Sequence, residues 1–543
     1  MASVQRATGK WAGVALACIV AFNLHAQTRD PVLDRISSAA KDTSQLADAL
    51  FQLTDAAGPR VVGSPALRHA EEWLSARLRD YGLSNVKLER NPPVNVGGGL
   101  TLDPPAWSWS RLTVQQLAPW QQTLIAVPVM YSASTKGPVS GEVTIAPLPR
   151  PSAADITAFI ERHRGRLRGR FLLVADREAA IAPQEGPGFH RYTPDELRAF
   201  AAATSPPPAA PPSPAPAARP AAPPAPASPP ALPPSPGETF KQFSRIFDFL
   251  RAEGVLALIS PARRGSQGGT LIVNGPPTPP GLASAPPPMV DLSPEHFNRL
   301  LRLTNHNVPV RLEVNLESTF HDRTGTQNVL GDIRGTGRPD EVVLVGAHLD
   351  SWHGATGATD NAIGVATVLE AVRILTASRV PLRRSVRVAF WQGEELFNLA
   401  GSRGYIQRYL FDERGTPTDS HRLLSAYLNL DYGSGRIRGI YLQGNDALKP
   451  VFDRWLADIG DGTLVASLRT ALGSDQAAFE GAGIPGLSFI QDPLNYEQRT
   501  HHTNMDEPDY VVLDDARASA VALASVIYRL ANADMLLPRK RVQ

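Results

Sequence analysis

The sequence is nearly devoid of cysteine, and this absence limits how the protein can be stabilised. Its 543 residues include one cysteine, Cys18, which lies in an N-terminal segment that we expect to be removed. The mature chain would then carry no thiol and could form no disulfide, even in an oxidising compartment. Its stability must therefore come from packing and from bound metal.

The sequence also lacks an excess of charge of either sign. Lys and Arg number 54 and Asp and Glu 52, so the formal net charge is +2 with neutral histidine. Segment 1–26 holds two positive charges, Arg6 and Lys10, and no acidic residue. Its removal leaves a mature chain without net charge, and we predict neither nucleic acid nor anionic membrane as a partner.

The N-terminus has the three-part pattern of a secretory signal. A basic region is followed by an apolar run over 11–22 and by a small-residue cleavage site at Leu24, His25 and Ala26. The apolar run is too short to span a bilayer comfortably. We predict cleavage after residue 26, a secreted or periplasmic protein, and no stable membrane association afterwards. The sequence does not indicate an oligomeric state.

The rest of the chain is long enough for more than one domain. Its 43% hydrophobic and 20% charged residues are typical of soluble globular proteins. Residues 27–122 show helical spacing followed by a strand and are predicted to be the first part of an α/β domain. Residues 123–317 show short β-branched runs between turns, which predicts a small β-rich domain inserted into it. Residues 318–543 are predicted to complete the α/β domain.

The predicted insert contains a tract, residues 205–237, that is almost wholly Pro, Ala and Ser. Such a composition cannot bury apolar side chains, and we expect a disordered, extended spacer. A ligand for a domain that binds Pro-rich segments is the functional alternative. A solvated loop extension is the simpler interpretation, and we assign the tract no chemistry.

From residue 328 onward, apolar strands alternate with helices. Strands are predicted at 341–347, 385–391, 426–430, 439–443 and 486–490, and helices at 362–377, 402–410, 448–459, 474–480 and 514–533. This order predicts a mostly parallel mixed sheet with helices on both faces. Ligands of such sheets bind beyond the carboxyl ends of the strands.

Histidine and acidic residues follow these strands directly. The strand ends and adjoining loops carry His348, Asp360, Glu394, Glu395, Asp431 and His502. Imidazole and carboxylate groups are ligands of divalent ions, and two ions about 3.5–4 Å apart need a bridging carboxylate. Two histidines and three acidic residues suffice for two ions if Asp360 is shared. Of the adjacent Glu394 and Glu395, one can face a metal while the other accepts a proton from metal-bound water. This pattern predicts a metal-dependent hydrolase.

Five short motifs, taken in order, resemble those of the co-catalytic di-zinc exopeptidase family. They are GAHLDS at 346–351, GATDN at 357–361, GEE at 393–395 followed by AGS at 400–402, NLD at 429–431, and HT at 502–503 with Asp506. That family includes bacterial leucyl aminopeptidases, aminopeptidase Y and plasma glutamate carboxypeptidase. The resemblance implies a zinc-aminopeptidase-like α/β fold and an insert that is similar to a protease-associated domain.

The resemblance also implies a role for each site residue. One Zn²⁺ would be held by His348, Asp360 and Glu395, and a second by Asp360, Asp431 and His502. Glu394 would be the general base that activates a metal-bridging water. Asp350 would hold the His348 ring through its carboxylate, as metal-bound histidines generally require. His501 competes with His502, but the position before Thr503 and four before Asp506 favours His502.

These residues predict a secreted zinc-dependent exopeptidase that hydrolyses the terminal bonds of peptides. Aminopeptidase activity is the first expectation. A dipeptidase or carboxypeptidase of the plasma glutamate carboxypeptidase type is the nearest alternative. A one-zinc enzyme similar to glutaminyl cyclase has a related fold. A non-catalytic receptor-like binding protein is the alternative from another class, and retention of all five ligands and the base counts against it.

Overall fold

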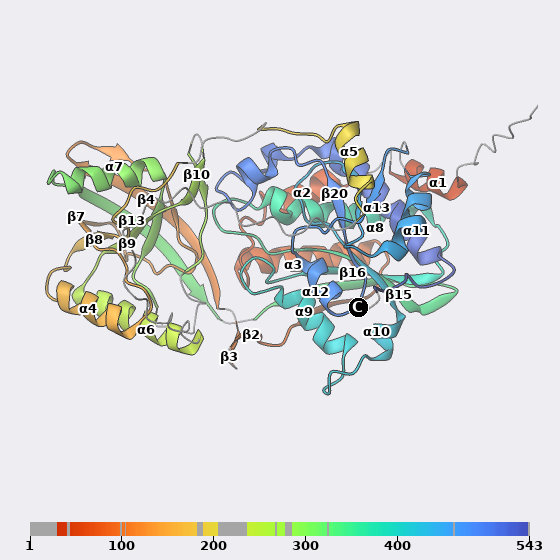
Figure 1. Ribbon diagram of the computed structural model, residues 1–543, viewed down its shortest axis with the longest axis horizontal. Coiled ribbons are helices and arrows are strands. Elements are labelled where there is room, and N and C mark those ends of the chain that lie inside the picture. Colours follow the sequence, from red (N-terminus) through yellow and green to blue (C-terminus); the bar gives the residue numbers. More distant parts are fainter. Residues whose placement is uncertain are drawn as a thin grey trace, which may run out of the picture.

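Two eight-stranded sheets organise the chain in the computed structural model (Figure 1). The structure describes residues 30–540, apart from the segments 41–43, 98–99, 104, 182–187, 205–235, 267–268, 277–284, 323–324 and 460–461. The predicted signal segment and almost all of the Pro- and Ala-rich tract therefore lie outside the described residues.

The main sheet has the strand order β1-β14-β16-β15-β17-β20-β18-β19. Its strands are β1 (Ser84–Arg90), β14 (Gln327–Ile333), β15 (Arg338–His348), β16 (Arg384–Trp391), β17 (Leu424–Asn429), β18 (Ile437–Tyr441), β19 (Val465–Ser467) and β20 (Gly486–Gln491). Strand β15 runs parallel to β16 and β17, and β17 runs parallel to β20. Strands β14 and β1 continue the sheet in antiparallel pairing. The predicted mixed sheet is confirmed.

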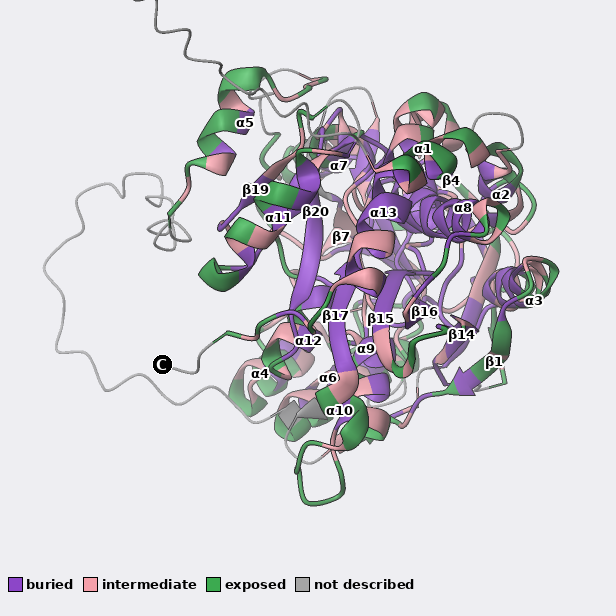
Figure 2. Cartoon of the chain, turned by 90° about the vertical axis from the view of Figure 1, so that its right-hand side faces the viewer, coloured by how far each residue is buried: buried purple, intermediate pink, exposed green. Residues whose placement is uncertain are grey.

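Helices cover both faces of the main sheet (Figure 2). One face carries α1 (Pro31–Ala39), α2 (Leu46–Leu53), α3 (Pro65–Asp80), α8 (Ile363–Ser378), α11 (Lys449–Leu456) and α13 (Leu513–Asn532), and the other α9 (Ala400–Tyr405), α10 (Asp419–Leu423) and α12 (Asp475–Gly481). Within the described residues, only the helical stretch Ala358–Ser378 is long and apolar enough to cross a membrane, and 83% of its apolar window is buried inside the fold. It packs against α1, α2 and α13 as a core helix.

The insert is built on the second sheet, with the strand order β5-β4-β13-β7-β8-β9-β12-β6. Its strands are β4 (Ala106–Ala118), β5 (Gln122–Thr123), β6 (Ala126–Pro128), β7 (Val139–Ile145), β8 (Arg170–Leu173), β9 (Ala257–Pro261), β12 (Met289–Leu292) and β13 (Arg311–His321). Helix α7 (Pro294–Asn305) packs on one apolar cluster, and α4 (Ala153–His163) and α6 (Pro236–Glu253) pack on another.

The sheet of the insert extends beyond the predicted segment 123–317, because β4 pairs along its whole length with β13. Strands β7, β8, β9 and β12 of this sheet are parallel, and helices α4, α6 and α7 pack against it. The partner of β4 lies almost two hundred residues further along the chain, so local pattern could not assign that strand to a sheet.

Candidate metal centre

Five loops at the carboxyl edge of the main sheet bring the predicted ligands together. His348 ends β15 and lies opposite Trp391 in parallel register. The other side chains come from the loops after β16, β17 and β20 and from the turn Ala358–Ala362 before α8; these side chains are Glu394, Glu395, Asp431, His502 and Asp360. Parallel strands end at the same edge, which is why residues far apart in the sequence meet there.

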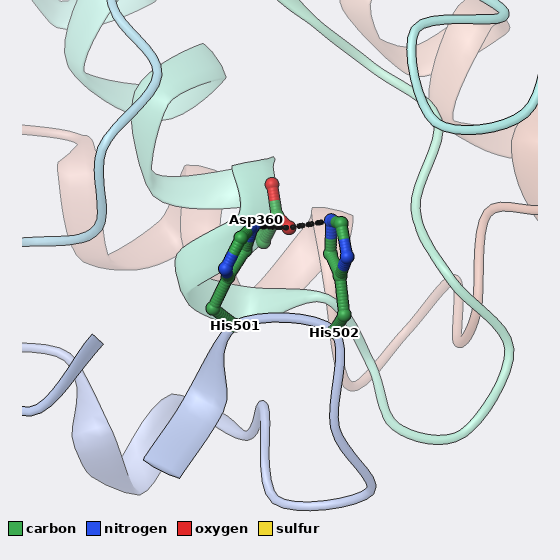
Figure 3. A group of neighbouring side chains, drawn as sticks. All are labelled: Asp360, His501 and His502. Carbon is green, nitrogen blue, oxygen red and sulfur yellow. Dashed lines mark ion pairs between the residues drawn. The ribbon is translucent and has the colours of Figure 1, made fainter. Parts of the chain in front are cut away.

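Asp360 lies between the two histidines. Nε2 of His348 is 3.2 Å from Oδ1 of Asp360. Nε2 of His502 is 3.2 Å from Oδ2 of the same carboxylate, and Figure 3 shows this second contact. His348 is also 3.2 Å from Asp431 Oδ1, and His502 is 3.1 Å from Glu395 Oε2. The two oxygens of Asp360 thus face two separate groups of ligands, as a bridging carboxylate must.

The distances favour a division of the ligands that differs from the expected one. Nε2 of His348 lies 3.2 Å from Asp431, and Nε2 of His502 lies 3.1 Å from Glu395. Strand β15 is flanked by both β16 and β17. Either neighbour could therefore have supplied the partner of His348, and only the path of the two loops decides between them.

His501 remains close to the centre, but its contacts differ from those of His502. Its Nε2 is 3.9 Å from Asp360 Oδ2, and its Nδ1 is 3.3 Å from Glu497. Its ring stacks on Tyr496 with 4.7 Å between centroids. Figure 3 shows both imidazoles rising from one loop toward Asp360. His502 is favoured as the ligand because its Nε2 lies closer to Asp360, at 3.2 Å, and 3.1 Å from Glu395, which is itself a candidate ligand.

Asp350 does not act on His348 in the expected manner. The ring Nδ1 of His348 lies 3.0 Å from the backbone carbonyl of Asp350, whereas the carboxylate is 3.8 Å away. The carboxylate instead accepts the backbone N–H groups of Glu394 and Glu395, each at 3.4 Å. Asp350 therefore orients the ring through its main chain and holds the Glu394–Glu395 turn through its side chain.

The loop that carries Asp360 is held by Asp506. The buried carboxylate of Asp506 accepts the N–H and hydroxyl of Thr359, both at 2.6 Å, and the N–H of Asp360 at 3.0 Å. Gly357 precedes this loop with a φ of +67°, and a Cβ there would lie 2.4 Å from Cβ of Ser351. The glycine-rich sequence is thus required by a left-handed turn against a neighbouring loop.

Two further residues at the site had no assigned role from the sequence. Ser474 donates its hydroxyl to Asp431 Oδ2 at 2.5 Å and so orients that carboxylate. Arg60 is fully buried beneath the loops of His348 and Asp360. Ser474 precedes α12 (Asp475–Gly481), and nothing in the sequence around Arg60 distinguishes it from a surface arginine.

Burial dominates the electrostatics of the acidic residues. Desolvation raises the pKa of Glu394 well above its usual value, with further raising by Asp431 and Glu395. Desolvation likewise raises the pKa of Glu395 to about 6. For Asp360 desolvation is outweighed by the two histidines, which hold the pKa of this carboxyl well below its usual value. Burial therefore makes the Glu394 carboxylate more basic than an exposed one, whereas the histidines make Asp360 less basic.

The donor set fits divalent metal ions. Within the described residues, Asp360 Oδ2 and Glu395 Oε1 are buried and accept no hydrogen bond, although an imidazole nitrogen lies close to each carboxylate. Buried carboxylate oxygens are normally satisfied. Oxygen and nitrogen atoms that crowd together without hydrogen-bond geometry are expected where they face a common ion.

A cavity of about 400 Å³ opens on this centre. Asp360, Glu394, Asp431, His501 and His502 line its inner part, and the rest of its wall includes the rings of Tyr192, Tyr432, Tyr441, Phe489 and Tyr496. Among the described residues that line it, none is Lys or Arg. The cavity thus combines acidic groups beside the metal ligands with an aromatic wall.

Relatives and solved structures with the same features support this interpretation. Residues 328–527, which include all five motifs, match peptidase family M28. Carboxypeptidase Q of Homo sapiens is 23% identical over 252 residues, covering 46% of this chain and 51% of that protein. Leupeptin-inactivating enzyme 1 of Streptomyces exfoliatus is 30% identical over 159 residues, covering 29% and 34%. The chain spans about half the length of the first of these curated relatives and a third of the second.

The fold is shared over nearly the whole chain. A peptidase M28 precursor from Shewanella amazonensis has a TM-score of 0.61 at 20% identity, covering 94% of this chain and 98% of its own. A zinc aminopeptidase from Bacillus subtilis has a TM-score of 0.51 at 19% identity, covering 90% and 95%. Residues 328–527 of this chain thus match peptidase family M28 in sequence, and the domain built on the main sheet, which contains them, is called the M28 domain below.

Proposed function

We propose that this protein is an exported aminopeptidase that uses two zinc ions to release residues from the N-termini of peptides. The charge of the cavity carries the choice of substrate end. Its wall includes Glu394, Asp431 and Glu497, and no Lys or Arg among the described residues. An α-ammonium group is attracted by carboxylates, whereas an α-carboxylate requires a cationic partner.

Each zinc ion would take three ligands from this chain. His348, Asp360 and Asp431 would hold one, and Asp360, Glu395 and His502 the other, as their mutual distances favour. When bound, the ions supply Lewis acidity that polarises the scissile carbonyl and lowers the pKa of water. The structure adds Asp506 and Ser474 as residues that keep Asp360 and Asp431 oriented.

Glu394 would move the proton in this reaction. Its side chain lines the cavity, and it is not among the carboxylates that lie against His348 or His502. Its carboxylate accepts a proton from the attacking water as the new C–O bond forms. It then delivers that proton to the amine nitrogen as the C–N bond breaks, so that a free amine leaves. Burial raises the pKa of Glu394, which makes its carboxylate a stronger base for the first transfer.

Glu394→Gln tests this role in the mature protein loaded with zinc. We expect zinc content by mass spectrometry to stay at two ions while kcat for leucine anilide falls by about 10³ or more. Glu497→Gln is the matched control, because it removes another carboxylate of the same cavity. It should raise KM more than it lowers kcat. Unchanged turnover by Glu394→Gln would remove Glu394 from the mechanism.

End specificity is tested with two sets of substrates. Amino-acid anilides carry a free amine without a carboxylate, and N-acylated dipeptides carry a free carboxylate without an amine. We expect hydrolysis of the first set alone. Cleavage of the second set would instead identify a carboxypeptidase, and one bound zinc with pyroglutamate formation would identify a glutaminyl cyclase. N-terminal sequencing of exported protein should begin at Gln27.

A further inference from the structure

A short segment between two parts of the insert crosses to the M28 domain. Residues up to 181 still belong to the insert, where Asn298 binds both the N–H and the carbonyl of Ala179. Helix α5 (Pro194–Ala201), however, contacts β19 of the main sheet. Figure 1 shows α5 over the M28 domain, whereas α4 and α6 lie beside the insert sheet. We call residues 189–202 the strap.

The strap is anchored to the loop that leads from β20 to the metal ligands. His190 and Leu494 exchange two backbone hydrogen bonds, each of 2.8 Å. The N–H of Tyr192 donates to Asp492 Oδ1 at 2.8 Å. Arg191 lies 2.5 Å from Asp515 and 3.4 Å from Asp492, whose carboxylate is almost fully buried. Asp492 thus contacts a backbone N–H and a charged side chain of the strap, and these contacts fix this part of the strap in position.

Aromatic packing then fixes the helix of the strap. The Tyr192 and Phe200 rings are 5.0 Å apart, and Phe200 lies 5.9 Å from Tyr441. The guanidinium of Arg469 covers Phe200 at 4.5 Å. Ring pairs at these distances add to the apolar burial between the two surfaces. The side chain of Tyr192 is therefore held at one place in the wall of the cavity.

From these contacts we infer that Tyr192 is a specificity-determining residue of this peptidase and that the strap exists to place it. The inference rests on the proposed aminopeptidase function. Tyr192 lines the same cavity as Glu394 and Asp431, together with Tyr432, Tyr441 and Phe489. A terminal residue bound at the metals would extend its side chain toward these rings. Large apolar side chains would bury surface against Tyr192, and an alanine side chain is too short to do so.

The test compares Phe-, Leu- and Ala-anilides with the full mature enzyme. Tyr192→Ala should lower kcat/KM for the Phe and Leu substrates about tenfold, chiefly through KM, because about 50 Å² of apolar contact is lost. The Ala substrate should keep its kcat/KM within about twofold. Tyr192→Phe should behave as wild type, since the ring remains. Arg198→Ala is the matched control on the same strap, because that side chain is 71% exposed.

Arg191→Met provides a second perturbation, which substitutes none of the residues that line the cavity but loosens the strap that carries Tyr192. It removes the ion pairs with Asp492 and Asp515, and it should reduce the preference for large side chains in the same direction as Tyr192→Ala. Unchanged selectivity in both variants would overturn the inference while the aminopeptidase activity stands. Failure of the wild-type enzyme on all three anilides would instead overturn the proposed function and this inference with it.

Discussion

Arg60 lies in the N-terminal part of the M28 domain. It connects that part to the loop that follows His348 at the end of β15 and to the loop that carries Asp360 before α8. Its guanidinium donates hydrogen bonds of 2.5–2.9 Å to the carbonyls of Leu53, Leu349, Thr356 and Gly357. Burial lowers its pKa to about 10, although neighbouring carboxylates raise it. Arg60 is therefore charged at neutral pH and is the donor to four buried or partly buried acceptors.

Replacing Arg60 with Met keeps the length of the side chain and removes every donor. A hydrogen bond to a charged group contributes about 1.5–3 kcal/mol, but water can reach part of the site and restore some of the loss. Removal of one partner from a buried charged network costs about 3–5 kcal/mol. We therefore expect Arg60→Met to reduce the free energy of unfolding of the M28 domain by about 4 kcal/mol, a thousandfold change in equilibrium.

Hydrogen exchange of peptides from β15 (Arg338–His348) measures this free energy within one domain of a two-domain chain. Exchange should accelerate about a thousandfold in Arg60→Met and by a smaller factor in Arg60→Lys, which keeps the charge. Arg79→Met replaces an exposed arginine of α3 and should leave exchange unchanged. A loss below about 1 kcal/mol in Arg60→Met would refute the reasoning, because it would mean that the four carbonyls find other donors.

Two further predictions concern contacts between the insert and the M28 domain. Asn504 accepts the N–H of Leu271 at 2.6 Å beside His502, so Asn504→Ala should weaken zinc retention in a chelator competition about tenfold, and unchanged retention would contradict this role. His353 is fully buried with Nε2 2.6 Å from the carbonyl of Pro128, and burial lowers its pKa to about 4. As the pH falls, the unfolded chain protonates His353 at a higher pH than the folded chain does. The free energy of unfolding therefore decreases by up to about 3 kcal/mol between pH about 6.5 and about 4. His353→Gln should flatten the dependence of Tm on pH in that window, and an unchanged slope would contradict the assignment.

The main sheet was predictable because its signals are local. Strands β15, β16, β17, β18 and β20 are apolar runs followed by turns, and the helices between them have the helical period of apolar residues. The three-residue strand β19 (Val465–Ser467) was not predicted. Strand β4 was not predictable in the same way, since half of its residues are polar and its partner β13 is distant. The cis peptide bond between Asp360 and Asn361 also has no signal in the sequence.

The sequence by itself determined which chemical groups stand after the strands of the M28 domain: two histidines, the paired glutamates and two aspartates within five ordered motifs. Residues next to a strand end move with that strand, so their arrival at one edge follows from a parallel sheet. Only the tertiary structure decided that His348 lies with Asp431 and His502 with Glu395. It alone placed Arg60 beneath the site and Tyr192 in its wall, because these contacts join segments hundreds of residues apart and depend on loop paths that no local pattern encodes.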